Sequence, residues 1–188
     1  MADRLPPLTV FGKTTARVDR IGTLSIAERP DLALASLAAR LGRLSSLEAV
    51  APLVLGASLP GVSRVAGDTI RAFWTGPEQW LVEAPHATHE DLAAILKQGF
   101  GADASVTEQS DGWCAFDIAG AAMPDLMERL CAADTRAMAQ GDVLRTTIEH
   151  LGCFIICEAP ASSFRLWCAR SSALSLHHAL VTAAVALS

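Results

Sequence analysis

The stretch FWTGPEQWLVEAP, residues 73–85, decides the fold because it reads as two strands joined by a tight turn. Apolar residues alternate with polar ones on both sides of a Gly-Pro-Glu segment. A hairpin must bring such positions to one face, and a slip of one residue would turn a strand over. The apolar positions share a face only if the connection holds an odd number of residues, most simply 76–78. This parity predicts that Trp74 lies opposite Trp80.

Two facing indoles allow two interpretations. Trp74 and Trp80 would bury a large apolar area with little loss of side-chain entropy, which is typical of a core anchor. The alternative is that an indole edge contacts a partner chain. The same parity places Arg71 opposite Glu83 on the other face of the hairpin.

Further strands and helices follow from the spacing of apolar residues. Strands are expected near 17–26, 69–75, 79–84, 105–110, 112–118, 143–150, 153–158 and 164–169. Helices are expected to open at Asp31, Ser45, Thr88, Ala121 and Ser172, and Pro52 should limit the second of them. The inner faces are expected to carry Leu34, Leu37, Ala38 and Leu41 in the first helix, Leu92, Ile95 and Leu96 in the third, Met123, Leu126, Met127 and Leu130 in the fourth, and Leu176, Leu180, Ala183 and Leu187 in the last. The dipeptide Asp111-Gly112 is typical of a tight turn and predicts that the strands on either side of it pair with each other.

Two segments repeat the same order of a strand, a hydroxyl residue and a helix. Residues 80–96 align without gaps with residues 164–180, so that Leu92 falls on Leu176 and Leu96 on Leu180. Hairpins with intervening helices indicate an α+β fold of antiparallel sheets with packed helices, built from two related hairpin-plus-helix units.

The expected domain organisation is simple. Residues 1–16, with Pro6-Pro7 and little periodicity, read as a loose arm. Residues 17–188 are expected to form a single α+β domain made of two halves, about 17–100 and 101–188.

Composition excludes several classes of protein. The formal net charge is −5 and no cluster of Lys and Arg appears, so nucleic-acid binding is not expected. No segment resembles a signal peptide, and the apolar run at 179–187 is shorter than the roughly 20 residues that a membrane span needs, so a cytoplasmic protein is expected. The 51% hydrophobic content is either absorbed by dense packing or covered in part by another chain.

A search for chemistry finds no active site. FGKTT at 11–15 resembles the tail of a phosphate-binding loop, but Pro7 stands where that loop needs glycine. No GxGxxG or GxSxG motif is present, and tyrosine is absent. Candidate carboxylates are Asp111, Asp117, Asp125, Glu149 and Glu158, each with a structural role available, such as an ion pair between Asp125 and Arg129.

No metal site is predicted either. His177 and His178 are neighbours on a helix and point about 100° apart, so they do not hold one ion together. Cys153 and Cys157 share a strand face but lie too far apart for a simple clamp. The five widely spread cysteines indicate buried, reduced thiols.

Three stretches together resemble one known family. They are FWTGPEQWLVEAP, then VTEQSDGWCAFDIAGAAMPDLMERLC, then GDVLRTTIEHLGCFIICEAPASSFRLWCARSSALSLHHAL. Their order and spacing, over about residues 56–182, are similar to the gamma subunit of heterotetrameric sarcosine oxidase. The first fifty residues are much less distinctive.

The resemblance implies a fold like the folate-binding domain of the glycine-cleavage T-protein. It also implies partners, the alpha, beta and delta subunits, with FAD, FMN, NAD and tetrahydrofolate held by the larger subunits. Such an assembly demethylates sarcosine oxidatively to glycine, forms hydrogen peroxide and passes the one-carbon unit to folate. The gamma chain of that family carries no known catalytic residue, so no catalytic, cofactor-binding or metal position is assigned here.

Two other hypotheses stay open. The stretch LGCFIICE partly resembles a motif of stand-alone folate-binding relatives of the T-protein: Gly152, Cys153, Phe154 and Glu158 match, whereas Leu151, Ile156 and Cys157 replace its lysine, glycine and glutamine. This favours an independent folate-binding protein, although a buried strand explains the same residues. The other hypothesis is a self-associating scaffold.

Overall fold

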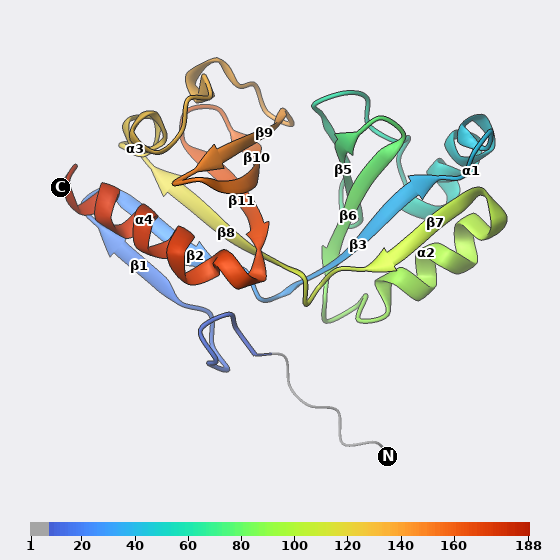
Figure 1. Cartoon of the computed structure of the whole chain (residues 1–188), viewed down its shortest axis with the longest axis horizontal. Helices are drawn as coiled ribbons and strands as arrows, with labels where there is room; N and C mark the ends of the chain where they lie inside the picture. Colours follow the sequence, from blue (N-terminus) through green and yellow to red (C-terminus); the bar gives the residue numbers. More distant parts are fainter. Residues whose placement is uncertain (1–7) are drawn as a thin grey trace. The chain divides into compact units, whose positions relative to one another are not determined.

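The computed structural model describes residues 8–188, which form two compact units. Unit 1 holds residues 8–30 together with Gly112–Gln140 and Arg145–Ser188, and unit 2 holds Asp31–Asp111 and Gly141–Leu144. Each unit has one antiparallel sheet with two α-helices against it (Figure 1). The α+β class with antiparallel sheets and packed helices is therefore confirmed.

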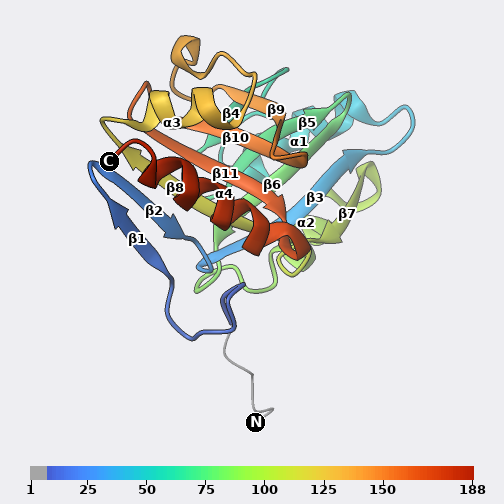
Figure 2. The ribbon, with the colours of Figure 1, turned by 60° about the vertical axis from the view of Figure 1, so that its left-hand side comes forward.

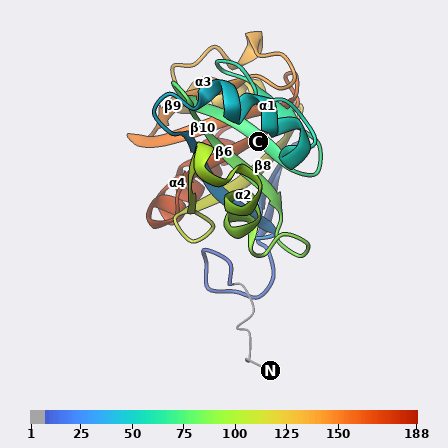
Figure 3. The ribbon, with the colours of Figure 1, turned by 90° about the vertical axis from the view of Figure 1, so that its right-hand side faces the viewer.

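The sheet of unit 2 has five strands in the order β4-β5-β6-β3-β7. Their bounds are β3 Leu32–Ala39, β4 Val65–Gly67, β5 Arg71–Gly76, β6 Gln79–Pro85 and β7 Ala104–Glu108. Figure 3 shows the two helices of this unit, α1 (Leu44–Leu55) and α2 (Leu92–Phe100), on the same face of the sheet. They bury a shared core with β3 and β6, in which Leu47, Trp80, Leu92 and Leu96 take part.

The sheet of unit 1 has six strands in the order β1-β2-β8-β11-β10-β9. Their bounds are β1 Val18–Ile21, β2 Leu24–Glu28, β8 Trp113–Gly120, β9 Val143–Ile148, β10 Leu151–Ala159 and β11 Ser163–Ala169. Figure 2 shows α3 (Met123–Leu130) and α4 (Ala173–Val185) on one face of it. The predicted stripe of α3 is confirmed, since Met123, Leu126, Met127 and Leu130 are all buried.

The two sheets are built by the same sequence of elements. In unit 2 the chain runs β3, α1, β4, β5, β6, α2, and in unit 1 it runs β8, α3, β9, β10, β11, α4. The predicted hairpin-plus-helix units are thus β5-β6-α2 and β10-β11-α4, and the matched leucines Leu92, Leu96, Leu176 and Leu180 are all fully buried.

The strand that pairs with the free side of the first strand of the repeat, β3 or β8, has a different origin in the two units. In unit 2, β7 follows α2 and pairs with β3. In unit 1 the corresponding place beside β8 is filled by β2, which comes from the other end of the sequence. The observed units therefore do not coincide with the predicted halves of 17–100 and 101–188, because the first hairpin pairs with β8 of the second half.

The predicted helix from Asp31 is wrong, because residues 32–39 form the central strand β3. Leu34 and Leu37 are both buried although they point to opposite faces of the strand, so both faces are apolar and the alternation of a strand is hidden. Leu41, expected on the inner face of that helix, is fully exposed.

The predicted pairing around Asp111-Gly112 is also wrong. β7 pairs with β3 in one sheet, whereas β8 pairs with β2 and β11 in the other. The dipeptide therefore lies where the chain passes from one unit to the next. The turn residues mark a change of direction but not which strand becomes the neighbour.

Three helix starts differ from the prediction. Arg43 precedes α1, so the predicted cap Ser45 lies inside the helix, and so does Pro52, which was expected to limit it. α2 begins four residues after the predicted start at Thr88, and Ser172 precedes α4 but makes no side-chain capping bond. These helices are held mainly by their buried faces, which is the usual source of helix stability in proteins.

The described part of the N-terminal arm is tied to unit 1. The buried carboxylate of Glu28 accepts hydrogen bonds from the backbone N–H of Val10 at 2.7 Å and of Arg17 at 3.0 Å. The guanidinium of Arg170 donates to the carbonyl of Leu8 at 3.0 Å. Residues 8–16 are therefore fixed by side chains from two distant elements, while residues 1–7 lie outside the described part of the chain.

Candidate functional site

The tryptophan hairpin has the predicted register. Trp74 pairs with Trp80, and the antiparallel ladder runs from there to Arg71 opposite Glu83. A two-residue turn at 77–78 and a bulge between Trp74 and Gly76 together supply the odd number of residues that the parity required.

The two indoles lie in different surroundings. Trp80 is 5% exposed, and its indole N–H donates to the carbonyl of Pro60 at 2.9 Å. Trp74 is half-buried against the core of unit 2. Trp80 thus acts as the core anchor that the sequence suggested, whereas contact of Trp74 and Trp80 with a partner stays a prediction.

Replacing Trp80 by Phe is expected to lower the free energy of unfolding by about 1–2 kcal/mol, because the buried carbonyl of Pro60 loses its donor. Trp74→Phe is the matched control and is expected to cost about half as much or less, since that side chain is only half-buried. Urea denaturation followed by circular dichroism measures both. Equal losses for the two variants would contradict the anchoring role of Trp80.

On the other face of the hairpin lies a buried ion pair. Nε of Arg71 is 3.2 Å from Oε1 of Glu83, and the side chain of Glu83 is 2% exposed. Sequence parity placed these residues opposite each other but did not show that the pair is buried.

A second group of charges lies on the sheet of unit 1, and we call it the arginine–carboxylate cluster (Arg29, Asp117, Glu158 and Arg165). Arg165 donates to Asp117 through Nε at 2.7 Å and through Nη2 at 3.1 Å. Arg29 donates to the same carboxylate, and Glu158 lies 3.9 Å from Nε of Arg165. The structure thus brings together two of the carboxylates that the sequence singled out.

The arginines of the cluster stabilise the ionised form of Asp117. Burial by itself opposes ionisation of Asp117, but the bonds from Arg165 and the charge of Arg29 outweigh it and hold the pKa of Asp117 below its usual value. Asp117 is therefore a paired carboxylate at neutral pH, which suits a structural role better than that of a general acid.

The other candidate carboxylates lie apart from this cluster. Asp111 is in the connection between the units, and Asp125 pairs with Arg136 at 2.5 Å rather than with Arg129 as expected. Arg136 also pairs with Glu128, so the short 3-10 turn after α3 competes for the charges on that helix.

The two neighbouring histidines of α4 have separate surroundings, as their helical spacing predicted. Nε2 of His177 is 2.7 Å from Oδ2 of Asp19, and Phe11 lies edge-on to the same ring at 4.9 Å between centroids. His178 is exposed and lines a hollow. No sequence pattern predicts the bond between His177 and Asp19, because β1 and α4 are far apart along the chain.

Three cysteines lie side by side across the sheet of unit 1. Cys168 of β11 is opposite Cys114 of β8, with 3.3 Å between the Sγ atoms, and opposite Cys153 of β10. All five cysteines are free thiols, as expected, and four of them are buried. Burial and the nearby Cys168 raise the pKa of Cys153 to about 12, and a hydrogen bond with Cys114 together with burial raises that of Cys168 well above its usual range.

These pKa shifts predict slow thiol chemistry, because the thiolate is the reactive form. In the folded protein at pH 8, iodoacetamide is expected to label the half-buried Cys131 first and to leave Cys153 and Cys168 unlabelled. Peptide mass mapping gives the order, and the same reaction in urea, where all five should label, is the control. Labelling of Cys168 as fast in the folded as in the unfolded chain would contradict this.

Across residues 8–188, no group of three or more His, Cys, Asp or Glu side chains is placed to hold an ion. Within the same residues, no helix is both long and apolar enough to cross a membrane.

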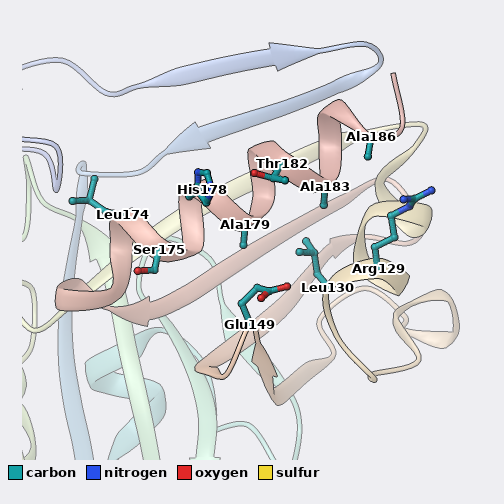
Figure 4. Close-up of a pocket in the computed structure, with 10 residues that line it drawn as sticks. All are labelled: Arg129, Leu130, Glu149, Leu174, Ser175, His178, Ala179, Thr182, Ala183 and Ala186. Carbon is teal, nitrogen blue, oxygen red and sulfur yellow. The ribbon is translucent and has the colours of Figure 1, made fainter.

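A hollow of about 740 Å³ lies between α3, α4 and the turn that joins β9 to β10 (Figure 4). We call it the α3–α4 groove; its lining residues are Arg129, Leu130, Glu149, Leu174, Ser175, His178, Ala179, Thr182, Ala183 and Ala186. Figure 4 shows small side chains of α4 along one side, with Leu130 and Glu149 pointing in from the other. Sequence reasoning missed this groove, since nothing in the pattern shows how α3 lies beside α4.

Comparison with known proteins establishes the class of fold. No protein-family model and no curated protein sequence matches the chain. Solved structures do match, and they place the chain in the fold shared by a sarcosine oxidase chain and an aminomethyltransferase of the glycine cleavage system.

The first match is the heterotetrameric sarcosine oxidase from Corynebacterium sp. U-96 in complex with pyrrole 2-carboxylate. The TM-score is 0.75 at 22% identity, over 89% of this chain and 86% of the matched one. The second is the glycine cleavage system aminomethyltransferase T from Bartonella henselae, with a TM-score of 0.59 at 12% identity, over 82% of this chain. This chain spans only 44% of the aminomethyltransferase, so it corresponds to a part of that protein.

Proposed function

We propose that the chain is a gamma-type, non-catalytic subunit of a heterotetrameric sarcosine oxidase. The observation that carries the proposal is the match to a chain of such an oxidase over 89% of one chain and 86% of the other. Coverage that is high in both directions indicates two chains of similar length. The match therefore covers nearly the whole of that oxidase chain rather than one domain of a larger chain.

The sequence motifs support the same assignment independently. The three stretches similar to the gamma subunit lie on β5-β6, on β7-β8-α3 and on β9-β10-β11-α4, so they follow the elements that make up the repeat. They therefore specify the shape of the domain rather than a cluster of reactive side chains.

The charged groups also support a structural role. Asp117, Glu158 and Glu83 are each paired with arginine, and Asp125 is paired with Arg136. In this proposal the alpha, beta and delta subunits are the partners. The larger subunits hold FAD, FMN, NAD and tetrahydrofolate and carry out the oxidation of sarcosine and the transfer of its methyl carbon. The gamma-type chain contributes folded mass and contact surface, in the cytoplasm.

Purification of the tagged chain from its native cells tests the proposal. The expected result is a larger assembly with a flavin absorption spectrum, whose other chains are identified by mass. Recovery of the chain as a flavin-free single species would overturn it. So would oxidation of sarcosine by the isolated chain at a rate comparable to that of the assembly.

The match to aminomethyltransferase T favours a second candidate, an independent folate-binding protein. Its partial motif, LGCFIICE, lies on β10, where Cys153, Ile155, Ile156 and Cys157 are buried within unit 1. Calorimetric titration of the isolated chain with tetrahydrofolate separates the two candidates: saturable binding supports this one, and a flat titration removes it.

A further inference from the structure

The α3–α4 groove has a floor of small side chains at helical spacing. Ser175, Ala179 and Ala183 are four residues apart, so they form one row along α4. A row of small side chains allows another backbone to approach closely.

The other half of the repeat shows what such a small residue does. The alignment of 80–96 with 164–180, carried on along the helices, places Gly99 of α2 at the position of Ala183 of α4. A Cβ atom at Gly99 would lie 2.7 Å from both γ-methyl carbons of Val54, so this position is in close contact with α1. In unit 2 the small residue thus serves contact between two helices, whereas Ala183 in unit 1 lines an open hollow.

The walls of the groove carry opposite charges. Arg129 of α3 and Glu149 of the β9–β10 turn are exposed, and neither forms an ion pair with any other residue in the described range 8–188. Glu149 and His150 both have positive φ values, 48° and 68°, which non-glycine residues adopt only at a cost of about 1–3 kcal/mol each. The tight turn fixes the backbone from which Glu149 points into the groove (Figure 4).

The groove is long and has an exposed apolar side chain at one end. Leu174, near the start of α4, is 66% exposed. The lining from Leu174 to Ala186 extends over roughly 18 Å at 1.5 Å per residue, which is about three turns of helix. Most of the polar lining residues are exposed, so a small molecule would stay largely in water here, whereas a helix would cover the whole length.

We propose that the α3–α4 groove binds a helix of about three turns from a partner subunit. The helix lays an apolar side on Ala179 and Ala183, with an acidic residue near Arg129 and a basic residue near Glu149. This inference rests on the proposed function, because it names the kind of contact that holds the chain in its assembly.

Two substitutions in the groove test it, each with a matched control outside. Ala179→Trp fills the groove, and Ala94→Trp places the same indole on the exposed side of α2. Glu149→Lys reverses the charge of one wall, and Glu48→Lys does so on an exposed position of α1. Each variant is co-expressed with the partner subunits. Assembly is measured by affinity purification and analytical ultracentrifugation, and circular dichroism checks the fold of each isolated variant.

The expected result is that the two groove variants bind the partner subunits at least tenfold more weakly while both controls bind like the wild type. Amide hydrogen exchange along α4 should also be slower in the wild-type assembly than in the isolated chain. Assembly of all four variants at wild-type strength, or unchanged exchange along α4, would overturn the groove proposal while leaving the proposed function in place. Failure of the wild type itself to assemble would overturn both. A wild-type homodimer that Ala179→Trp converts to monomers would assign the groove to a second copy of the chain and overturn the helix of a partner subunit.

Discussion

Replacement of Gly120 by alanine is expected to lower the free energy of unfolding by about 3 kcal/mol or more. Gly120 ends β8 opposite Leu24 of β2. Its φ is 138°, a value that residues other than glycine rarely adopt. A Cβ atom there would lie 2.0 Å from the carbonyl oxygen of Thr23, which is backbone and has no rotamer to move to. The clash would displace the β1–β2 hairpin from the sheet. Urea denaturation measures the resulting loss in the free energy of unfolding.

Gly61→Ala is the matched control for this substitution. A Cβ atom at Gly61 meets nothing within 4 Å, and its φ is outside the positive range. We expect the free energy of unfolding to change by about 1 kcal/mol or less. The change should be stabilising, because alanine reduces the conformational entropy of the unfolded chain. If both variants lost the same stability, the clash at Thr23 would not be the cause.

Asp117→Ala is expected to have the other large effect, a loss of about 3–5 kcal/mol. The substitution leaves Arg165, whose side chain is 9% exposed, and Arg29 without the carboxylate that they share. Asp125→Ala is the matched control, because its pair with Arg136 is exposed and should contribute about 1 kcal/mol or less. Thermal and urea unfolding of both variants measure the difference. A loss for Asp117→Ala as small as that of the control would show that the cluster is not a structural ion pair.

The same carboxylate predicts a dependence on pH. The folded-state pKa of Asp117 lies below its unfolded value, which is near 3.9. The stability that it contributes is therefore present above about pH 4 and is lost as the pH falls through the folded-state pKa. The difference in urea midpoint between the wild type and Asp117→Ala should accordingly shrink between pH 5 and pH 3. A difference that stays constant over that range would contradict the pairing.

The fold could be predicted where local rules and burial agree. The hairpin at 71–85 follows from parity alone, since Ala72 and Trp74 on one strand and Trp80 and Val82 on the other must share a face around one turn. The helix stripes of α2, α3 and α4 were visible because each of these helices has one buried face. Ile95 of α2 is more exposed than expected, and Ala183 and Leu187 of α4 are only half-buried. The prediction failed at β3, because its residues are buried on both faces and no alternation of polar and apolar residues remains to mark a strand.

Non-local pairing could not be predicted. The sequence shows Asp111-Gly112 as a turn, but the strands on either side pair with β3 and with β2, which are far away along the chain. The same holds for the candidate site. Trp74, Trp80 and the carboxylates were identified as residues, whereas the convergence of Asp117 and Glu158 on Arg165 requires the register of three strands. The α3–α4 groove requires the packing of two helices, which no single segment encodes.

The place of β2 beside β8 has a consequence for biosynthesis. A ribosome releases this hairpin early, yet its hydrogen-bonding neighbour emerges only after all of β3 to β7 has been made. Unit 2 draws nearly all its residues from one continuous segment and can begin to fold during that interval, whereas the first hairpin must wait with an open edge. A nascent chain stalled near Asp111 would thus display an unpaired β-edge to chaperones, and that edge would be covered only once β8 has been made.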